Sequence, residues 1–132
     1  MILGLRTALY HVPDLDRAKA WYREAFGVPP YFDEPFYVGF NVRGYELGLN
    51  PDTSKAPPGP GGSVAYWGVP EIQPAVDHFL KVGATLVEPA TDVGGGIKVA
   101  TVADPFGNLI GLIENPHFSM NGGGTKPHGQ RA

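Results

Sequence analysis

Two side chains in this sequence combine a chemically useful type with a place on a predicted strand. His11 follows an apolar, β-compatible stretch, and it could serve as a general base because imidazole titrates near neutral pH. Tyr66 could donate a hydrogen bond to a substrate oxygen. Both also have structural explanations, since a histidine at a strand end is commonly hydrogen-bonded or solvated and a tyrosine commonly buries its ring. The catalytic residues stay unassigned, with these two as candidates.

Other kinds of chemistry are excluded by composition. The chain has no cysteine, which rules out disulfides, thiolate metal ligands and a cysteine nucleophile and fits the cytoplasm, where we expect the protein. The glycine run 94–96 follows no strand-loop-helix pattern for phosphate binding, so we predict a hairpin tip there. The net charge of −3 argues against a nucleic-acid partner. We expect no membrane contact, since no apolar run reaches the roughly 18–20 residues that span a bilayer.

The elements that would position these side chains occur in two copies. Residues 12–22 and 69–79 share Val, Pro, an acid, a branched aliphatic residue, Ala and an aromatic residue in register, 57 positions apart. The dipeptide Asn-Pro also occurs twice, at Asn50-Pro51 and Asn115-Pro116, 65 positions apart. A duplicated unit predicts a pseudo-symmetric domain with a cleft between its halves.

Each copy is predicted to be a β-α-β-β-β module. Asp14 offers an N-cap to the first helix, and Gly27 and Gly83 end the two helices. The first module is predicted to contain a strand at 2–12, a helix between Asp14 and Gly27, and strands near 30–34, 36–42 and 45–50. The second is predicted to contain a strand at 63–69, a helix at 71–82, and strands near 85–90, 97–103 and 109–114. Together they predict an α+β fold.

The length predicts one domain, because units of this size are near the lower limit for burying a core alone. We place the domain at 1–118, with modules at 1–51 and 63–116 and a Pro/Gly-rich linker at 52–62. Residues 119–132 are predicted to be a flexible tail, because too little there is apolar.

Three segments carry a resemblance to a known family. They are the strand end Val12-Pro13-Asp14-Leu15, the helix with Trp21-Tyr22 that ends at Gly27, and the turn Asp104-Pro105-Phe106-Gly107-Asn108 before an apolar strand. Over about residues 3–116 the chain resembles the vicinal oxygen chelate superfamily, which includes glyoxalase I, bleomycin-resistance proteins and extradiol dioxygenases. The resemblance implies two modules whose curled mixed sheets surround a cleft.

Enzymes of this superfamily hold a divalent metal on His, Glu or Gln side chains from the first and last strand of each module. The resemblance carries those positions over to Thr7, Glu46, Val64 and Gly111. Glu46 alone offers a suitable donor, because Val64 and Gly111 have none and a threonine hydroxyl is a poor ligand for a transition metal. We therefore expect no metal and no other cofactor. A register slip of one residue would invert this assignment, since strand side chains alternate faces.

Strand alternation around these positions predicts a ligand-binding cleft. The predicted lining is Thr7, Leu9, His11, Glu46, Tyr66 and Ile113. Tyr37, Phe40 and Trp67 would add stacking surface if they face inward. A mostly apolar lining with a few polar groups suits a small organic ligand.

We expect a small-molecule-binding protein similar to the bleomycin-resistance branch, which sequesters a metabolite or drug and forms a homodimer. The alternative is a divalent-metal-dependent lyase, isomerase or dioxygenase of the same superfamily, with Glu46 and His11 in an unusual site. A shifted register or a partner chain would then have to complete the metal ligands. A third hypothesis is an interaction module whose pocket is filled by side chains.

Overall fold

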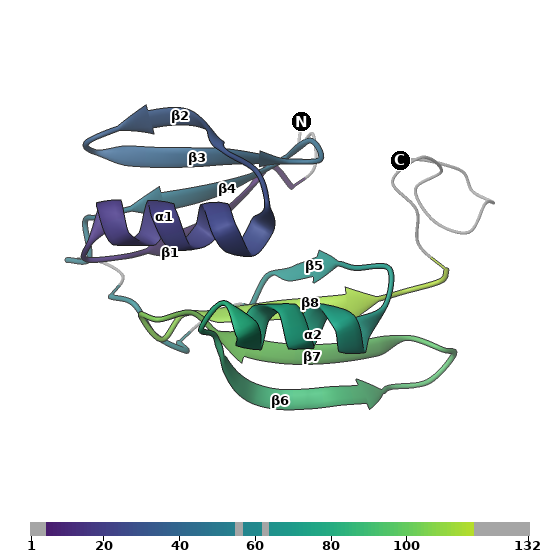
Figure 1. Cartoon of the computed structure of the whole chain (residues 1–132). Helices are drawn as coiled ribbons and strands as arrows, with labels where there is room; N and C mark the ends of the chain where they lie inside the picture. The colour runs from purple at the N-terminus through teal and green to yellow at the C-terminus, as the bar shows by residue number, and fades with distance from the viewer. Residues whose placement is uncertain (1–4, 55–56, 62–63, 118–132) are drawn as a thin grey trace.

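The computed structural model describes residues 5–54, 57–61 and 64–117, and it confirms the α+β fold of two β-α-β-β-β modules (Figure 1). The first module consists of β1 (Thr7–His11), α1 (Leu15–Phe26), β2 (Pro30–Glu34), β3 (Tyr37–Val42) and β4 (Tyr45–Asn50). The second consists of β5 (Tyr66–Gly68), α2 (Ile72–Lys81), β6 (Thr85–Asp92), β7 (Lys98–Ala103) and β8 (Leu109–Glu114). The first strand of each module is shorter than predicted, and the other elements lie close to their predicted bounds.

Each module forms its own four-stranded mixed sheet. The strand orders are β1-β4-β3-β2 and β5-β8-β7-β6. The pairs β1–β4 and β5–β8 are parallel, whereas the other neighbouring strands pair antiparallel. The sheets curl without closing, and each helix packs against one face of its own sheet (Figure 1). In the part of the chain that the structure describes, the other face of each sheet carries no helix.

Local sequence explains where α1 begins and ends. Asp14 Oδ1 accepts a hydrogen bond from Arg17 N at 3.1 Å, so the predicted N-cap is present. Gly27 takes a φ of 74°, and its N–H donates to the Arg23 carbonyl. The side chains that α1 buries are Ala18, Trp21, Tyr22 and Ala25.

The second helix begins differently, because the side chain of Glu71 makes no capping bond. The free N–H of Ile72 instead donates to Glu114 Oε1 of β8 at 2.8 Å, so a strand side chain caps the helix. At the C-terminal end of this helix, Val82 packs against the core, whereas Leu80 is 38% exposed.

The modules pack against each other through their helices. Phe26 of α1 meets Phe79 of α2 edge to face, with ring centroids 5.6 Å apart. Trp21 Nε1 donates to the Val82 carbonyl at 2.8 Å. Buried side chains of both modules form one hydrophobic cluster, as expected for units too small to bury a core alone.

The turn that begins at Asp104 also joins the modules. Asp104 Oδ1 accepts hydrogen bonds from the backbone N–H groups of Phe106 and Asn108, each at 2.8 Å, so the carboxylate caps its own turn. Its Oδ2 accepts from the Tyr22 hydroxyl of α1 at 2.7 Å. Asn108 Nδ2 donates to the His11 carbonyl at 3.0 Å. The Asp104–Asn108 turn, which carries part of the family resemblance, therefore also connects the two modules.

The predicted domain, module and linker boundaries remain predictions, and the predicted tail at 119–132 lies outside the described residues. Within the described ranges, the structure contains no helix that is long and apolar enough to cross a membrane.

Candidate functional site

Strand alternation gives each sheet a helix-covered face and an open face. On β1, Tyr10 is buried toward the core, whereas Thr7, Leu9 and His11 point to the open face. Glu46 on β4 lies in register beside Thr7 and shares that face. Four of the six predicted cleft residues therefore come together on the first sheet.

The central parallel pairs show where the predicted metal positions lie. Thr7 pairs with Glu46, whereas Gly111 pairs with Tyr66 and Val64 precedes β5. Val64 and Tyr66 are two residues apart, so strand alternation assigns them to the same face.

Glu46 is the centre of a hydroxyl cluster on the open face of the first sheet. Thr7 Oγ1 donates to its Oε1 at 2.8 Å, and the Tyr31 hydroxyl donates to its Oε2 at 2.5 Å. The Tyr37 phenol lies on the same face beside this carboxylate and helps to lower its pKa. The sequence predicted Thr7 and Glu46 here, whereas Tyr31 was missed. We call Thr7, Tyr31, Tyr37 and Glu46 the Glu46 cluster.

A bulge on the edge strand explains why Tyr31 joins the cluster. The β2–β3 register shifts between Pro30 and Phe32. Phe32 pairs with Gly39 on the open face, and the extra residue Tyr31 reaches the same side, where its ring approaches Gly39 and its hydroxyl reaches Glu46. A bulge re-aims a side chain in this way. Regular alternation would have assigned Tyr31 and Phe32 to opposite faces, so periodicity gave no signal for Tyr31.

Two glycines make room for the cluster. A Cβ on Gly39 would lie 2.7 Å from Glu46 Oε2 and 3.1 Å from Tyr31 Cε1. A Cβ on Gly48 would collide with the Tyr37 hydroxyl. These two positions therefore need glycine so that the carboxylate and the phenol rings can lie against the sheet.

The cluster shifts the pKa values of its members. Burial alone would raise the pKa of Glu46, but hydrogen bonds from Tyr31 and Thr7, together with the Tyr37 phenol, outweigh it and lower that pKa below its usual value. Burial, followed by the charge of Glu46, raises the pKa of Tyr37 to about 12. The hydrogen bond to Glu46 is the main cause that raises the pKa of Tyr31. The site therefore combines an ionised carboxylate with neutral phenols near pH 7.

On the second sheet, the position that corresponds to Glu46 is surrounded by different side chains. Tyr66 lies over Gly111, where a Cβ would come within 2.6 Å of its ring. Ile113 pairs with Gly68 and lies half-buried on the same open face. An aromatic ring thus occupies the position that corresponds to the Glu46 carboxylate.

His11 and the conditional aromatic residues have specific surroundings. His11 Nδ1 donates to the Asp52 carbonyl at 3.0 Å, which matches the hydrogen-bonded strand-end alternative. Tyr37 faces the open side, whereas Phe40 is fully buried in the core. Trp67 also turns toward the core, where it contacts Phe26 and donates through Nε1 to the Tyr10 hydroxyl. Neither Phe40 nor Trp67 adds stacking surface to the open faces.

The residues at the family's metal positions do not fit a divalent metal. Glu46 accepts hydrogen bonds from the Thr7 and Tyr31 hydroxyl groups, so Thr7, the other predicted position in this module, acts as a donor to Glu46. Val64 and Gly111 supply no donor atom. Across the described residues, no three His, Asp or Glu side chains gather closely enough to hold an ion. A metal held with a partner chain would need donors from that chain.

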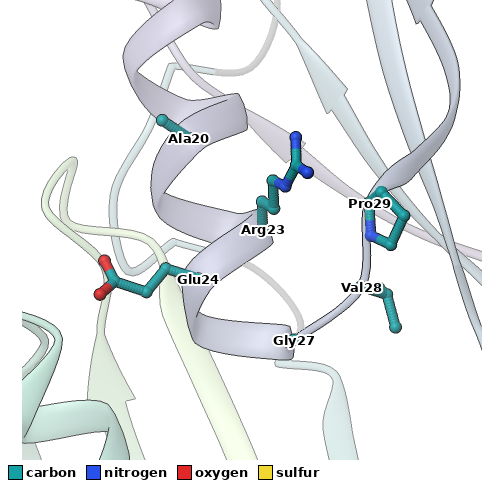
Figure 2. A pocket seen from close by; sticks show the side chains of 6 residues that line it. All are labelled: Ala20, Arg23, Glu24, Gly27, Val28 and Pro29. Carbon is teal, nitrogen blue, oxygen red and sulfur yellow. The ribbon is translucent and has the colours of Figure 1, made fainter.

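A separate hollow of about 500 Å³ lies at the C-terminal end of α1 and the segment after it. Its lining residues are Ala20, Arg23, Glu24, Gly27, Val28 and Pro29. Figure 2 shows Arg23 on the side facing Pro29 and Glu24 pointing away from it. Both charged side chains are exposed, and neither makes a described ion pair. We place the candidate site at the Glu46 cluster because its polar groups converge.

Comparison with known proteins supports the fold. A glyoxalase-related enzyme from Fulvimarina pelagi has a TM-score of 0.75 at 21% identity, over 93% of this chain and 96% of that one. TioX from Micromonospora sp. ML1 has a TM-score of 0.69 at 18% identity, over 84% and 98%. Lactoylglutathione lyase from Agrobacterium tumefaciens has a TM-score of 0.68 at 19% identity, over 87% and 96%. At these identities the likeness shows a shared fold. No curated protein matches the chain.

A family model decides the class. The model of the Glyoxalase/Bleomycin resistance protein/Dioxygenase superfamily matches residues 4–112, which is most of the chain. The protein therefore belongs to that superfamily, and the resemblance inferred from the sequence is confirmed.

Proposed function

We propose that this protein binds a small organic molecule on the open face of the first sheet, at the Glu46 cluster, without a divalent metal. The observation that carries the proposal is a carboxylate held by hydrogen bonds from two hydroxyl groups, beside a third phenol, among exposed aromatic rings. Tyr31 is 62% exposed and Phe36 is 65% exposed. Exposed apolar surface around a few fixed polar groups is typical of a ligand site.

Donor chemistry supports the metal-free part of the proposal. A carboxylate has about four acceptor positions, and hydrogen bonds from Thr7 and Tyr31 use two of them. A metal at Glu46 would have to displace these donors and would find no further protein ligand at Val64 or Gly111.

We further propose that a second copy of the chain covers the ligand in a homodimer in the cytoplasm. A bound small molecule is usually buried over about 70–90% of its surface, and a single open sheet face covers only one side of it. Leu9 and Tyr66, on the open faces of the two sheets, are 45% and 49% exposed, which leaves apolar surface for a partner. The absence of cysteine agrees with a reducing compartment.

Metal analysis of protein purified without chelator separates this proposal from the metalloenzyme alternative. We expect substoichiometric Zn, Ni, Mn and Fe. A stoichiometric metal that is lost in Glu46→Ala would contradict the metal-free site and support a metal-dependent lyase, isomerase or dioxygenase.

Matched glycine variants locate the ligand. We expect aromatic compounds to raise the melting temperature of the wild type, as ligands of a folded protein do. Gly48→Ala should abolish this shift, because the new methyl group displaces the Tyr37 hydroxyl. Gly68→Ala should retain it, because a Cβ there meets no atom within 4 Å. Equal responses of both variants would place the ligand elsewhere, and sedimentation as a monomer at all concentrations would refute the homodimer alone.

A further inference from the structure

The charge of Glu46 is not balanced inside its own cluster. Its two hydrogen-bond donors, Thr7 and Tyr31, are neutral hydroxyl groups, and so is the neighbouring Tyr37 phenol. The two bonds satisfy acceptor positions on the carboxylate but leave its full negative charge and about two acceptor positions free. The lowered pKa of Glu46 keeps it ionised near neutral pH.

No basic side chain on the sheet offsets this charge. Lys98 is the only Lys or Arg in the described strands, and it belongs to the second sheet. It lies opposite Glu114 in the β7–β8 register, and Glu114 Oε1 accepts a hydrogen bond from the start of α2. The one ion pair within the described ranges joins Lys19 of α1 to Asp33, on the helix-covered side. Glu34 pairs with Tyr37 on the open face and adds a second carboxylate there.

Aromatic rings stand beside the uncompensated carboxylate. Phe32 meets Phe36 and Tyr37 edge to face, with centroids 6.1 and 6.0 Å away. Tyr31, at 62% exposure, lies on the same face with its hydroxyl on Glu46. Ring faces attract cations, and they also pack against apolar groups. Negative charge and exposed rings together favour a cationic ligand with an apolar body over neutral or anionic ligands.

We propose that the ligand of this site is an organic amine, with its ammonium group at Glu46 and an apolar or aromatic body against Tyr31, Phe32 and Phe36. This inference rests on the proposed small-molecule function and specifies its ligand class. The ammonium supplies an N–H donor for a free acceptor position of the carboxylate and the positive charge that the neighbouring hydroxyl groups lack. The hairpin that joins β2 to β3 supplies the apolar contact.

One aromatic body with three different charges tests the proposal by calorimetric titration. The probes are 1-naphthylmethylamine, 1-naphthylmethanol and 1-naphthaleneacetate at pH 7. We expect the amine to bind about tenfold more tightly than the alcohol, and the acetate to bind least, because a single partly solvated charge pair contributes on this order. Raising the salt to about 1 M should reduce the preference for the amine, because added ions screen the pair.

Two isosteric variants locate the charge. Glu46→Gln should bring the amine and the alcohol within about twofold of each other while the alcohol still binds. Glu24→Gln removes the same charge from the exposed side of α1 and should leave the preference intact. Loss of the preference in Glu24→Gln would overturn the proposal. If Glu46→Gln does not fold, the comparison of amine and alcohol binding to the wild type at low and high salt still tests whether the ligand's charge matters.

The outcomes separate this inference from the function on which it rests. Equal binding of all three probes, or tightest binding of the acetate, would refute the amine class and leave a small-molecule site standing. Binding of none of the probes, with no melting shift from any aromatic compound, would refute the proposed function as well. A preference for the amine that Glu46→Gln removes would support both.

Discussion

Replacing Tyr22 with phenylalanine should lower the free energy of unfolding by about 1.5–3 kcal/mol, the contribution of a hydrogen bond to a charged group. Tyr22 is fully buried, and its hydroxyl donates to Asp104 Oδ2 at 2.7 Å. The substitution removes one oxygen and leaves Oδ2 with the Asn108 Nδ2 bond at 3.1 Å. That remaining bond should keep the loss below the roughly 3–5 kcal/mol of a stranded buried charge.

Two further tyrosines give matched comparisons, because each variant loses the same oxygen. The Tyr10 hydroxyl accepts from Trp67 Nε1 at 3.2 Å, so Tyr10→Phe should cost about 0.5–1.5 kcal/mol, as expected for a neutral pair. Tyr31 is 62% exposed, so Tyr31→Phe should change stability by about 0.5 kcal/mol or less. Tyr31 also donates to a carboxylate, but water can replace that bond at an exposed site, so the expected order follows burial first and the charge of the partner only between the two buried tyrosines.

Urea unfolding followed by tryptophan fluorescence measures these differences as midpoint shifts at unchanged slope. Protein concentration is held fixed, because a dimer makes stability depend on concentration. In a double-mutant cycle, Tyr22→Phe combined with Asp104→Asn should cost less than the sum of the two single changes. A Tyr22→Phe loss no larger than that of Tyr31→Phe, or strict additivity in the cycle, would show that this bond does not join the modules.

Three further predictions concern the Glu46 cluster and the helix starts. Glu46→Gln should lower the pKa of Tyr31 toward its usual value, and it should lower the pKa of Tyr37 less because burial is the main cause of the shift at Tyr37. NMR titration of the tyrosine rings measures both pKa values, and a larger fall at Tyr37 would contradict the prediction. Because the folded-state pKa of Glu46 is lowered, its ionised form stabilises the fold above the ordinary carboxyl pKa and this stabilisation is lost as pH falls, so the same variant should lose less stability in acid. Asp14→Ala should cost about 1 kcal/mol in urea unfolding, and Glu71→Ala less, because Asp14 alone caps its helix; equal costs would refute the difference.

Much of the open face could be predicted from the sequence because strand alternation is local. Knowing that Thr7 and Glu46 lie on two neighbouring strands was enough to place them together, and the structure pairs them in register. Gly111 pairs with Tyr66, two residues after Val64, and a difference of two residues preserves the face. An error of one residue would have exchanged the open and buried sets.

Other parts of the site depend on contacts between distant residues. Tyr31 reaches Glu46 only because the β2–β3 register shifts at a bulge, and a bulge interrupts the alternation on which the prediction depended. Trp67 turns away from the open faces as alternation from Tyr66 requires, and the ring of Phe26, from the other module, packs against it there. The orientation of Tyr31, by contrast, is not encoded in the neighbouring sequence.

The sequence by itself determined the duplicated β-α-β-β-β plan, the superfamily and the lack of suitable metal donors at Val64 and Gly111. These conclusions follow from residue type and periodicity, which are local properties. The tertiary structure alone decided that three neutral hydroxyl groups surround Glu46 without balancing its charge. That arrangement depends on the pairing of β1, β3 and β4 and on the bulge in β2, which bring together residues separated by up to 39 positions.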